Sequence, residues 1–425
     1  MEVKIFQGFD AFQEVFAAES ESDVSEAVQS ILKAVRKRGD DAVREYTERF
    51  DGVVLEQFRV EESVMQQALE DLDPELREVL EEAAQNIRDF HVRQRRQSEL
   101  EFHPDGTVLG WKVTAVDSAG VYIPGGRAVY PSSLLMNVIP AQVAGVPRIA
   151  MVSPPGRDSG TPHPLVMASA ALCGVNELYA LGGAQSVGAL AYGTESIPKV
   201  VKITGPGNAY VAEAKRQVYG LVGIDSFAGP SEILIVCDQA DVSVEYLVRD
   251  LLSQAEHDPE AGAILVTTHA AQAEAVAARL KELVPTLPRR EIIEASFASR
   301  SALIVVQDLD EAFDALNELA PEHLEVLTQN PMEDLARIRN AGAIFLGPYT
   351  PEPVGDYFAG PNHTLPTSGC AKFSSPLGVE DFIKTSSVLQ YSPERLARQG
   401  PAIIRFAEEE QLFAHAEAIR VRLKS

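Results

Sequence analysis

Short apolar runs that alternate with amphipathic stretches are the feature that most restricts the fold of this chain. From about Thr107 onward the apolar runs are RIAMVS, ELYAL, KVVKITG, EILIVCD, AILVTT, ALIVVQ and AIFLG. Helical patterns lie between them, such as AYVAEAKRQV (209–218) and AAQAEAVAARLKEL (270–283). Apolar strands alternating with helices predict βαβ units, whose parallel sheets are buried on both faces. Two such series, at about 125–230 and 231–347, predict an α/β fold with two doubly wound lobes.

The remainder of the chain does not follow this alternation. Apolar residues recur at helical spacing across 24–35, and a second, charged helical pattern covers about 62–98. Residues 348–376 form a segment rich in Pro and Gly without periodicity, and the tail from Ser392 is helical again. Because long irregular segments are uncommon in compact domains, this one is more often functional than idle.

Composition excludes several classes of protein. A chain of 425 residues is too long for one core, and 45% apolar with 23% charged residues is typical of a globular protein. No apolar run reaches the roughly 18 residues that span a bilayer. The acidic start of the chain lacks the features of a signal peptide, so we expect a cytoplasmic location. The three distant cysteines predict buried, reduced thiols rather than disulfides or a thiolate site: Cys173, Cys237 and Cys370.

The net charge of −25 argues against nucleic acid and membrane surfaces as partners. Any nucleotide phosphate would have to be held mainly by backbone N–H groups and helix N-termini. Three Gly-rich turns offer such groups: GVYIPGGR (120–127), LGGAQ (181–185) and ITGPGNAYVAEAK (203–215). The last is not the dinucleotide fingerprint, because Tyr210 occupies the third glycine position. Asp225, about twenty residues further on, is interpreted as a coincidence. Each turn alone is more often an ordinary tight turn, but the three together favour a ligand cleft.

Two short motifs place histidines beside other polar groups. In SQAEHD, Gln254 and His257 are three residues apart, so both could reach one cation from one helix face. From this stretch alone, a histidine that caps the last turn before Pro259 is the simpler interpretation. In APEHLE, Glu322 and His323 follow a helix and could line a cleft from a loop as a general acid–base pair, with a solvated loop pair as the alternative.

The irregular segment adds a third motif, VGDYFAGPNHTLPT, which contains Asp356 and His363. A carboxylate, imidazoles and an amide oxygen form a ligand set that suits zinc or manganese better than a thiolate-preferring metal. A long loop shaped by Gly and Pro around these two residues has little reason to exist as packing. The sequence therefore favours a metal site here.

Taken together, the motifs resemble those of histidinol dehydrogenases, in the same order and from about residue 20 to the end. The resemblance rests on SQAEHD, APEHLE, GDYFAGPNHTLPT and AHAEA, and on YIPGGRAVYPSSLLMN, GGAQS, GPGNAYVAEAKRQV and FAGPSE. It implies a zinc-dependent enzyme, with one zinc per subunit, that oxidises L-histidinol via L-histidinal to L-histidine with two NAD⁺. These are the last steps of histidine biosynthesis. It also implies an intertwined homodimer in which each C-terminal tail reaches the partner's active site.

The resemblance also implies roles for single residues of this sequence. The zinc ligands would be Gln254, His257, Asp356 and His415. His323 would be the base for the alcohol, and Glu322 the base that activates water to hydrate the aldehyde. Substrate contacts would come from Ser231, Gln254, His257, His323, Asp356, His363, Glu410 and His415. Contacts to NAD would come from Tyr122, Gln185 and Asn208.

The implied fold consists of two incomplete Rossmann-like lobes, which are doubly wound parallel sheets, with small helical N- and C-terminal tail domains. The expected boundaries are an N-terminal tail segment at 1–20, a first lobe with the metal and catalytic residues at 21–123 plus 231–375, a second lobe that contacts NAD at 124–230, and a helical dimerisation tail at 376–425.

Three other functions compete with this one. A related NAD- and zinc-dependent dehydrogenase of another small alcohol, such as a sulfonated diol, should lack the groups that recognise an imidazole and an amine. A zinc hydrolase would use Glu322 to activate a metal-bound water, but the chain has no HExxH helix. A binding protein without catalysis would not need the pair Glu322 and His323.

Overall fold

The computed structural model describes residues 2–16, 24–125, 129–226 and 229–424. The chain divides into two compact units, of which the first comprises 1–94 and 117–382 and the second 95–116 and 383–425. Each unit is described by itself. Along the described residues, no helix combines the length and the apolarity needed to cross a membrane.

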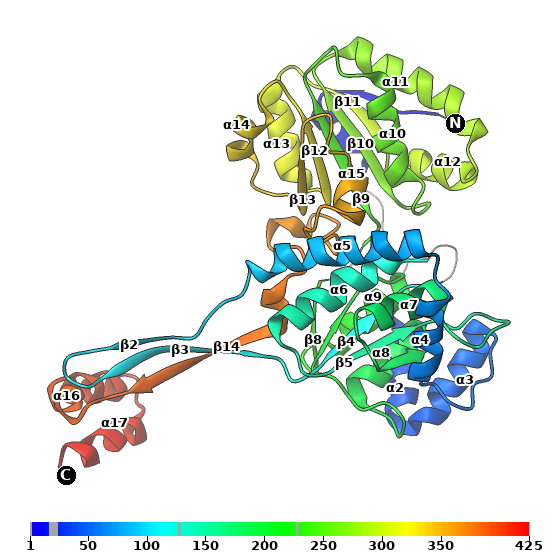
Figure 1. The fold of residues 1–425 in the computed structure, drawn as a ribbon. Coiled ribbons are helices and arrows are strands. Elements are labelled where there is room, and N and C mark those ends of the chain that lie inside the picture. Colours follow the sequence, from blue (N-terminus) through cyan, green and yellow to red (C-terminus); the bar gives the residue numbers. More distant parts are fainter. Residues whose placement is uncertain (1, 17–23, 126–128, 227–228, 425) are drawn as a thin grey trace. The chain divides into compact units, whose positions relative to one another are not determined.

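A six-stranded, fully parallel sheet organises one half of the first unit (Figure 1). Its strands lie in the order β1 (Ile5–Gln7), β11 (Ala302–Val305), β10 (Gly262–Thr267), β9 (Glu232–Cys237), β12 (His323–Leu327) and β13 (Ala343–Leu346). Side chains alternate along β9, so Ile233 and Ile235 enter one apolar cluster while Leu234 and Val236 enter the other. This explains why the strands are apolar without interruption.

Helices cover both faces of this sheet. The cluster around Ile233 contains side chains of α10 (Val244–Ala255), α11 (Ala270–Leu283) and α12 (Arg290–Ser299). The cluster around Leu234 contains side chains of α1 (Phe9–Phe16) and α13 (Leu309–Leu319). Shorter elements complete this half of the unit: η1 (Val284–Thr286), α14 (Pro331–Asp334), η2 (Leu335–Arg337), α15 (Glu352–Tyr357) and η3 (Cys370–Lys372).

The other half of the first unit is built on a five-stranded parallel sheet. Its order is β6 (Leu178–Ala180), β5 (Ile149–Ser153), β4 (Ala119–Tyr122), β7 (Lys202–Thr204) and β8 (Gly223–Ile224). The connecting helices are α6 (Pro131–Ala144), α7 (Pro164–Leu172), α8 (Gly183–Tyr192) and α9 (Ala209–Val218), and η4 (Val379–Phe382) packs on α6. The early helices α2 (Ser25–Arg38), α3 (Asp40–Asp51), α4 (Glu62–Glu70) and α5 (Pro74–Val92) pack on α6–α9.

Two observations here differ from the sequence-based expectations. The charged pattern at 62–98 is broken into α4 and α5, because Asp73 caps a new helix through its bond to the Leu76 N–H and Pro74 fits the first turn. In addition, α2–α5 lie beside the five-stranded sheet, whereas residues 21–123 were expected to form one lobe with the metal and catalytic residues. The domain boundaries stay a prediction.

Apart from the edge strand β1, both sheets share one strand order. From β9 or β4, the first two crossovers move outward in one direction, and the third crosses back to the other side of that strand. This is the doubly wound arrangement, so the predicted fold class is confirmed. The order reverses between β9 and β12 in one sheet and between β4 and β7 in the other.

The second unit joins segments that are far apart in sequence. The strands β2 (Glu99–Phe102), β3 (Val108–Ala115) and β14 (Ile383–Gln390) form an antiparallel sheet with β3 in the middle. The helices α16 (Pro393–Glu409) and α17 (Phe413–Arg420) and the turn η5 (Val421–Leu423) follow. The tail expected to be helical from 376 therefore contains strand β14, which pairs with β3 along eight residues.

Candidate active site

Glu322 and His323 lie at the amino-terminal end of β12, between β9 and β13. The chain leaves α13 through Ala320, a fully buried residue whose φ of 51° is left-handed, and turns at Pro321 into the strand. Glu322 Oε2 accepts a hydrogen bond from the Glu232 N–H at 3.0 Å. Both side chains are almost completely buried. The sequence predicted a loop pair here, but His323 is the first residue of a central strand.

One backbone contact sets the chemistry of the His323 ring. Its Nδ1 lies 3.1 Å from the carbonyl oxygen of Glu232, which can only accept, so Nδ1 carries the hydrogen of this bond. Among the described residues, Nε2 has no hydrogen-bond partner, and it lies 3.7 Å from Asp356 Oδ1. When the ring is neutral, Nε2 is therefore its basic nitrogen, which a general base requires.

Buried carboxylates surround this ring. Burial alone lowers the pKa of His323, but the nearby Glu352, Glu322 and Asp356 outweigh it and raise that pKa well above its ordinary value. Burial raises the pKa of Glu322 to about 8, although the charge of His323 opposes the shift. Shifts of this kind are typical of acid–base sites in clefts.

Three imidazoles influence the Asp356 carboxylate. It lies in the last turn of α15, and its Oδ1 is 3.7 Å from His323 Nε2 and 3.8 Å from His363 Nδ1. Burial raises the pKa of Asp356, but the three histidines His323, His363 and His257 lower it by more than burial raises it, so the net shift is downward. Burial lowers the pKa of His363.

The side chain of Gln254 has unsatisfied polar atoms. It lies near the end of α10 and is fully buried, yet among the described residues neither its amide oxygen nor its amide nitrogen has a partner. An unsatisfied buried amide is costly, and a bound cation would satisfy its oxygen. His257 follows in the exposed turn after α10, where its N–H donates to the Gln254 carbonyl at 3.1 Å.

Glu352 is a further candidate ligand that none of the sequence motifs above indicated. Its carboxylate, with His323 and Asp356, forms a group whose ligand atoms all lie within 4.8 Å of one another. Glu352 begins α15 four residues before Asp356, so both side chains lie on one face of that helix. This spacing in PEPVGD was the signal that could have identified it. The oxygen and nitrogen donors of the cluster fit a zinc or manganese ion.

A cleft of about 830 Å³ opens beside this cluster. His323, Asp356 and His363 line it from the amino-terminal edge of the six-stranded sheet and the segment after it. Asp225 lines it from the carboxyl end of β8, in the five-stranded sheet. Ligands of doubly wound sheets normally bind at the carboxyl edge. Here only the five-stranded sheet follows that rule.

The three residues expected to contact NAD lie at or after the carboxyl ends of three strands of the five-stranded sheet, β4, β6 and β7. Tyr122 ends β4, and its buried hydroxyl lies 3.4 Å from the Gly183 N–H, beside Gln185 at the start of α8. Gln185 is fully buried with both amide atoms unpartnered. Asn208 is exposed and caps α9, accepting from the N–H groups of Tyr210 and Val211. Tyr122 and Asn208 thus flank the point where the strand order reverses.

Asp225 has a definite role in this turn. Its Oδ2 accepts from the Gly205 N–H at 2.7 Å, its other oxygen pairs with the buried Lys215, and Lys215 Nζ donates to the Gly205 carbonyl at 3.0 Å. Asp225 therefore fixes the glycine turn, and this role does not contradict the interpretation of its spacing from that turn as a coincidence.

The remaining predicted residues lie outside the cluster. Ser231 is half-buried immediately before β9, where its carbonyl accepts from the Gly262 N–H at 3.0 Å. Glu410 and His415 belong to the second unit, at the end of α16 and in α17, and both are exposed.

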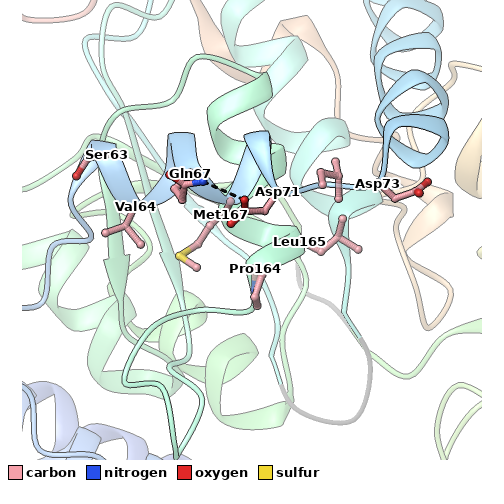
Figure 2. A pocket seen from close by; sticks show the side chains of 10 residues that line it. Ser63, Val64, Gln67, Asp71, Asp73, Pro164, Leu165 and Met167 are labelled. Atoms are coloured by element: carbon pink, nitrogen blue, oxygen red, sulfur yellow. Dashed lines mark hydrogen bonds between the residues drawn. The ribbon is translucent and has the colours of Figure 1, made fainter.

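A second hollow of about 480 Å³ lies between α4 and α7 (Figure 2). Val64, Leu165 and Met167 line it, together with Gln67, whose Nε2 donates to Asp71 Oδ1 at 2.9 Å. None of its described lining residues is a histidine or a predicted site residue. The acid–base chemistry belongs to the larger cleft.

Two doubly wound sheets that line one cleft, with a buried Glu–His pair and a candidate cation site in it, define the molecule as an α/β enzyme. A family model described as histidinol dehydrogenase matches residues 16–423, so the chain belongs to the histidinol dehydrogenase family, a family of oxidoreductases.

Named relatives agree with this membership. The chain is 53% identical to the histidinol dehydrogenase of Halalkalibacterium halodurans over 94% of this chain and 93% of the relative. It is 52% identical to that of Bacillus subtilis over 93% of this chain and 92% of the relative. The crystal structure of histidinol dehydrogenase from Elizabethkingia anophelis superposes with a TM-score of 0.93 at 33% identity, over 99% of this chain and 98% of that one. The resemblance inferred from the motifs is confirmed.

Proposed function

We propose that the protein oxidises L-histidinol via L-histidinal to L-histidine, with two NAD⁺ and one zinc ion per subunit, as the last steps of histidine biosynthesis. The observation that carries this proposal is the approach of Asp356 to His323 and His363 beside Glu322, in the cleft that Asp225 of the five-stranded half also lines. Family membership supports the substrate and the cofactors.

Zinc would be held by Gln254, His257 and Asp356, together with His415 from the tail of a partner chain. Bound there, it supplies a Lewis acid that holds the imidazole and amino nitrogens of the substrate. The unpartnered, buried amide of Gln254 supports this assignment, because only a ligand would satisfy it. A neutral amide also adds a ligand without a further negative charge.

His323 is proposed to take the proton of the alcohol hydroxyl while hydride leaves the carbon that carries this hydroxyl for the nicotinamide. The unpaired Nε2, held in position by the Nδ1 contact to Glu232, supports this role. An aldehyde cannot give up a second hydride until water adds to its carbonyl carbon. Glu322, in its ionised form, would take one proton from that water and return a proton to the carbonyl oxygen, which gives the gem-diol. His323 would then take a hydroxyl proton of the gem-diol while its carbon gives the second hydride to another NAD⁺.

Substrate and nucleotide contacts complete the proposed site. Ser231, His363 and Glu410 would contact the substrate, and Tyr122, Gln185 and Asn208 would contact NAD. The strand reversal at β4 and β7 supports the nucleotide position. The N–H groups around the turn of Gly205 would supply the phosphate contacts that an acidic chain lacks in its side chains.

An intertwined homodimer follows from the same assignment. The exposed positions of Glu410 and His415 on the second unit support their delivery to another chain. The boundaries given above, with a tail at 1–20, lobes at 21–123 plus 231–375 and at 124–230, and a dimerisation tail at 376–425, belong to this proposal. So does a cytoplasmic location, which fits a biosynthetic enzyme.

One assay tests the function: NADH formed per L-histidinol consumed, with and without a chelator. The proposal expects two NADH per substrate, loss of activity on chelation and recovery with zinc. Formation of no NADH would overturn it. A sulfonated diol as a parallel substrate tests the alternative alcohol dehydrogenase, and its oxidation in preference to L-histidinol would favour that reading.

A further inference from the structure

A group of acidic side chains adjoins the cluster, with Glu352 common to both, and has no place in the steps above. It consists of Asp250 on α10, Glu325 on β12 and Glu352 on α15. Glu325 is 2% exposed and Glu352 is 1% exposed, so neither is a surface charge. None of the three is among the residues that line the 830 Å³ cleft. Carboxyl groups buried in this way persist only where they make defined hydrogen bonds.

The first contact joins β12 to α15. Glu325 Oε1 accepts a hydrogen bond from the Glu352 N–H at 2.9 Å, at the first residue of α15. The N-cap residue Pro351 makes no side-chain cap. Glu325 therefore satisfies an N–H at the start of this helix from a neighbouring strand.

Two further contacts join α10 to the other elements. The carboxyl groups of Asp250 on α10 and Glu325 on β12 interact with each other. The Ser253 hydroxyl is shared between the Asp250 carbonyl at 2.7 Å and Glu352 Oε2 at 3.3 Å. The three elements are thus joined pairwise.

The same three elements carry three site residues, with a regular spacing. Asp250 precedes Gln254 by four residues on α10, and Glu352 precedes Asp356 by four on α15. His323 and Glu325 are two residues apart on β12. Residues four apart share a helix face, and residues two apart share a strand face. Each contact residue therefore lies on the same side of its element as the site residue it accompanies.

We propose that Asp250, Glu325 and Glu352 form a brace that sets the distances between Gln254, His323 and Asp356, with Glu325 as its central positioning residue. The inference rests on the proposed function, because it gives the brace the task of holding the zinc ligands and the base in register. Residues that support metal ligands typically change metal affinity by about 10- to 100-fold when they are replaced.

The test compares Glu325→Ala with Glu325→Gln in the full-length protein. Zinc affinity of the metal-free protein is measured by competition with a chromophoric chelator, and kcat and KM for L-histidinol at saturating zinc. The glutamine can still accept from the Glu352 N–H and donate to Asp250, so we expect zinc affinity within about threefold of the parent. The alanine should weaken zinc binding at least tenfold and lower kcat/KM.

Two further variants keep the result interpretable. Asn317→Ala removes a buried amide that joins α13 to the Arg337–Asn340 turn, and serves as the matched control for lost stability. If Glu325→Ala does not fold, a comparison of Asp250→Ala with Asp250→Asn tests the contact between Asp250 and Glu325 from its other side. The brace is overturned if the alanine variant binds zinc as well as Asn317→Ala does, or if glutamine is as harmful as alanine. A parent protein that fails to bind zinc or to oxidise L-histidinol overturns the proposed function itself.

Discussion

His323 owes its properties to contacts that lie outside its own motif. The ring is oriented by the carbonyl of Glu232, the first residue of β9, because β9 and β12 are neighbours in the sheet. Its charge depends on Glu352, which lies on α15. The motif APEHLE identifies the pair of side chains, but only the strand order supplies the partners that support the acid–base role proposed for the pair.

The two proposed bases should be separable by their effects on the two oxidations. With L-histidinol, Glu322→Gln should release the first NADH at a rate near that of the parent and slow the second by about 10²- to 10⁴-fold, because only hydration of the aldehyde needs its carboxylate. His323→Ala should slow both oxidations. Single-turnover absorbance traces of NADH measure this. Loss of the first phase in Glu322→Gln would contradict the assignment.

The raised pKa of Glu322 also predicts how the stability of the metal-free protein depends on pH. Burial raises this pKa from 4.5 to about 8, so the folded form keeps a proton that the unfolded form releases. The stabilisation is complete below the ordinary value and is lost as the pH rises through about 8, at up to about 1.4 kcal/mol per pH unit.

Glu322→Gln should flatten this decline in urea unfolding between about pH 5 and about pH 9. The exposed Glu333→Gln serves as the control and should leave the slope unchanged. Equal slopes in parent and Glu322→Gln would show that this carboxyl group does not titrate in that range.

Among the elements, the regular strands were the most predictable part of the molecule. The runs RIAMVS, EILIVCD and AILVTT coincide with β5, β9 and β10, because a strand buried on both faces must be apolar at every position. The spacing of Glu352 from Asp356 is visible in PEPVGD, but the approach of Glu352 to His323 could not be predicted from it. Neither could the pairing of Asp225 with Lys215, since each depends on residues brought together by a crossover. The antiparallel sheet of the second unit was not predicted either, because its strands β3 and β14 are separated by most of the chain.

The turn after β7 offers a test at this scale. Gly205 has φ of 112°, and a Cβ atom there would lie 2.1 Å from the Tyr122 carbonyl oxygen. Gly205→Ala should therefore separate β4 from the turn and weaken NAD binding at least tenfold, as measured by NADH fluorescence titration.

Gly220 is the matched control for this substitution. Its φ is 96°, but a Cβ atom would meet nothing within 4 Å. Gly220→Ala should cost about 1–2 kcal/mol of backbone strain and leave the affinity for NAD unchanged. Equal losses of affinity in both variants would show that the strain alone, and not the contact with Tyr122, is responsible.

For the whole molecule, the division into two units gives the tail its own test. If His415 completes the site of a partner chain, a His415→Ala chain and a Gln254→Ala chain fail separately but form one intact site when paired. Unfolding and refolding an equal mixture should restore about a quarter of the parental activity, because half of the dimers are mixed and each has one intact site. A mixture of His415→Ala with Glu410→Ala should restore none, because both changes affect the same tail. Absence of recovery in the first mixture would contradict shared sites.

The pairing of β3 with β14 also has a consequence for synthesis on the ribosome. The hairpin of β2 and β3 emerges early, and its third strand follows only after residues 117–382 have been made. At roughly 5–20 residues per second, the open edge of β3 waits on the order of tens of seconds for its partner. A two-stranded hairpin is only marginally stable by itself. The second unit is therefore completed last, and until β14 arrives the edge of β3 is open to pairing with other chains.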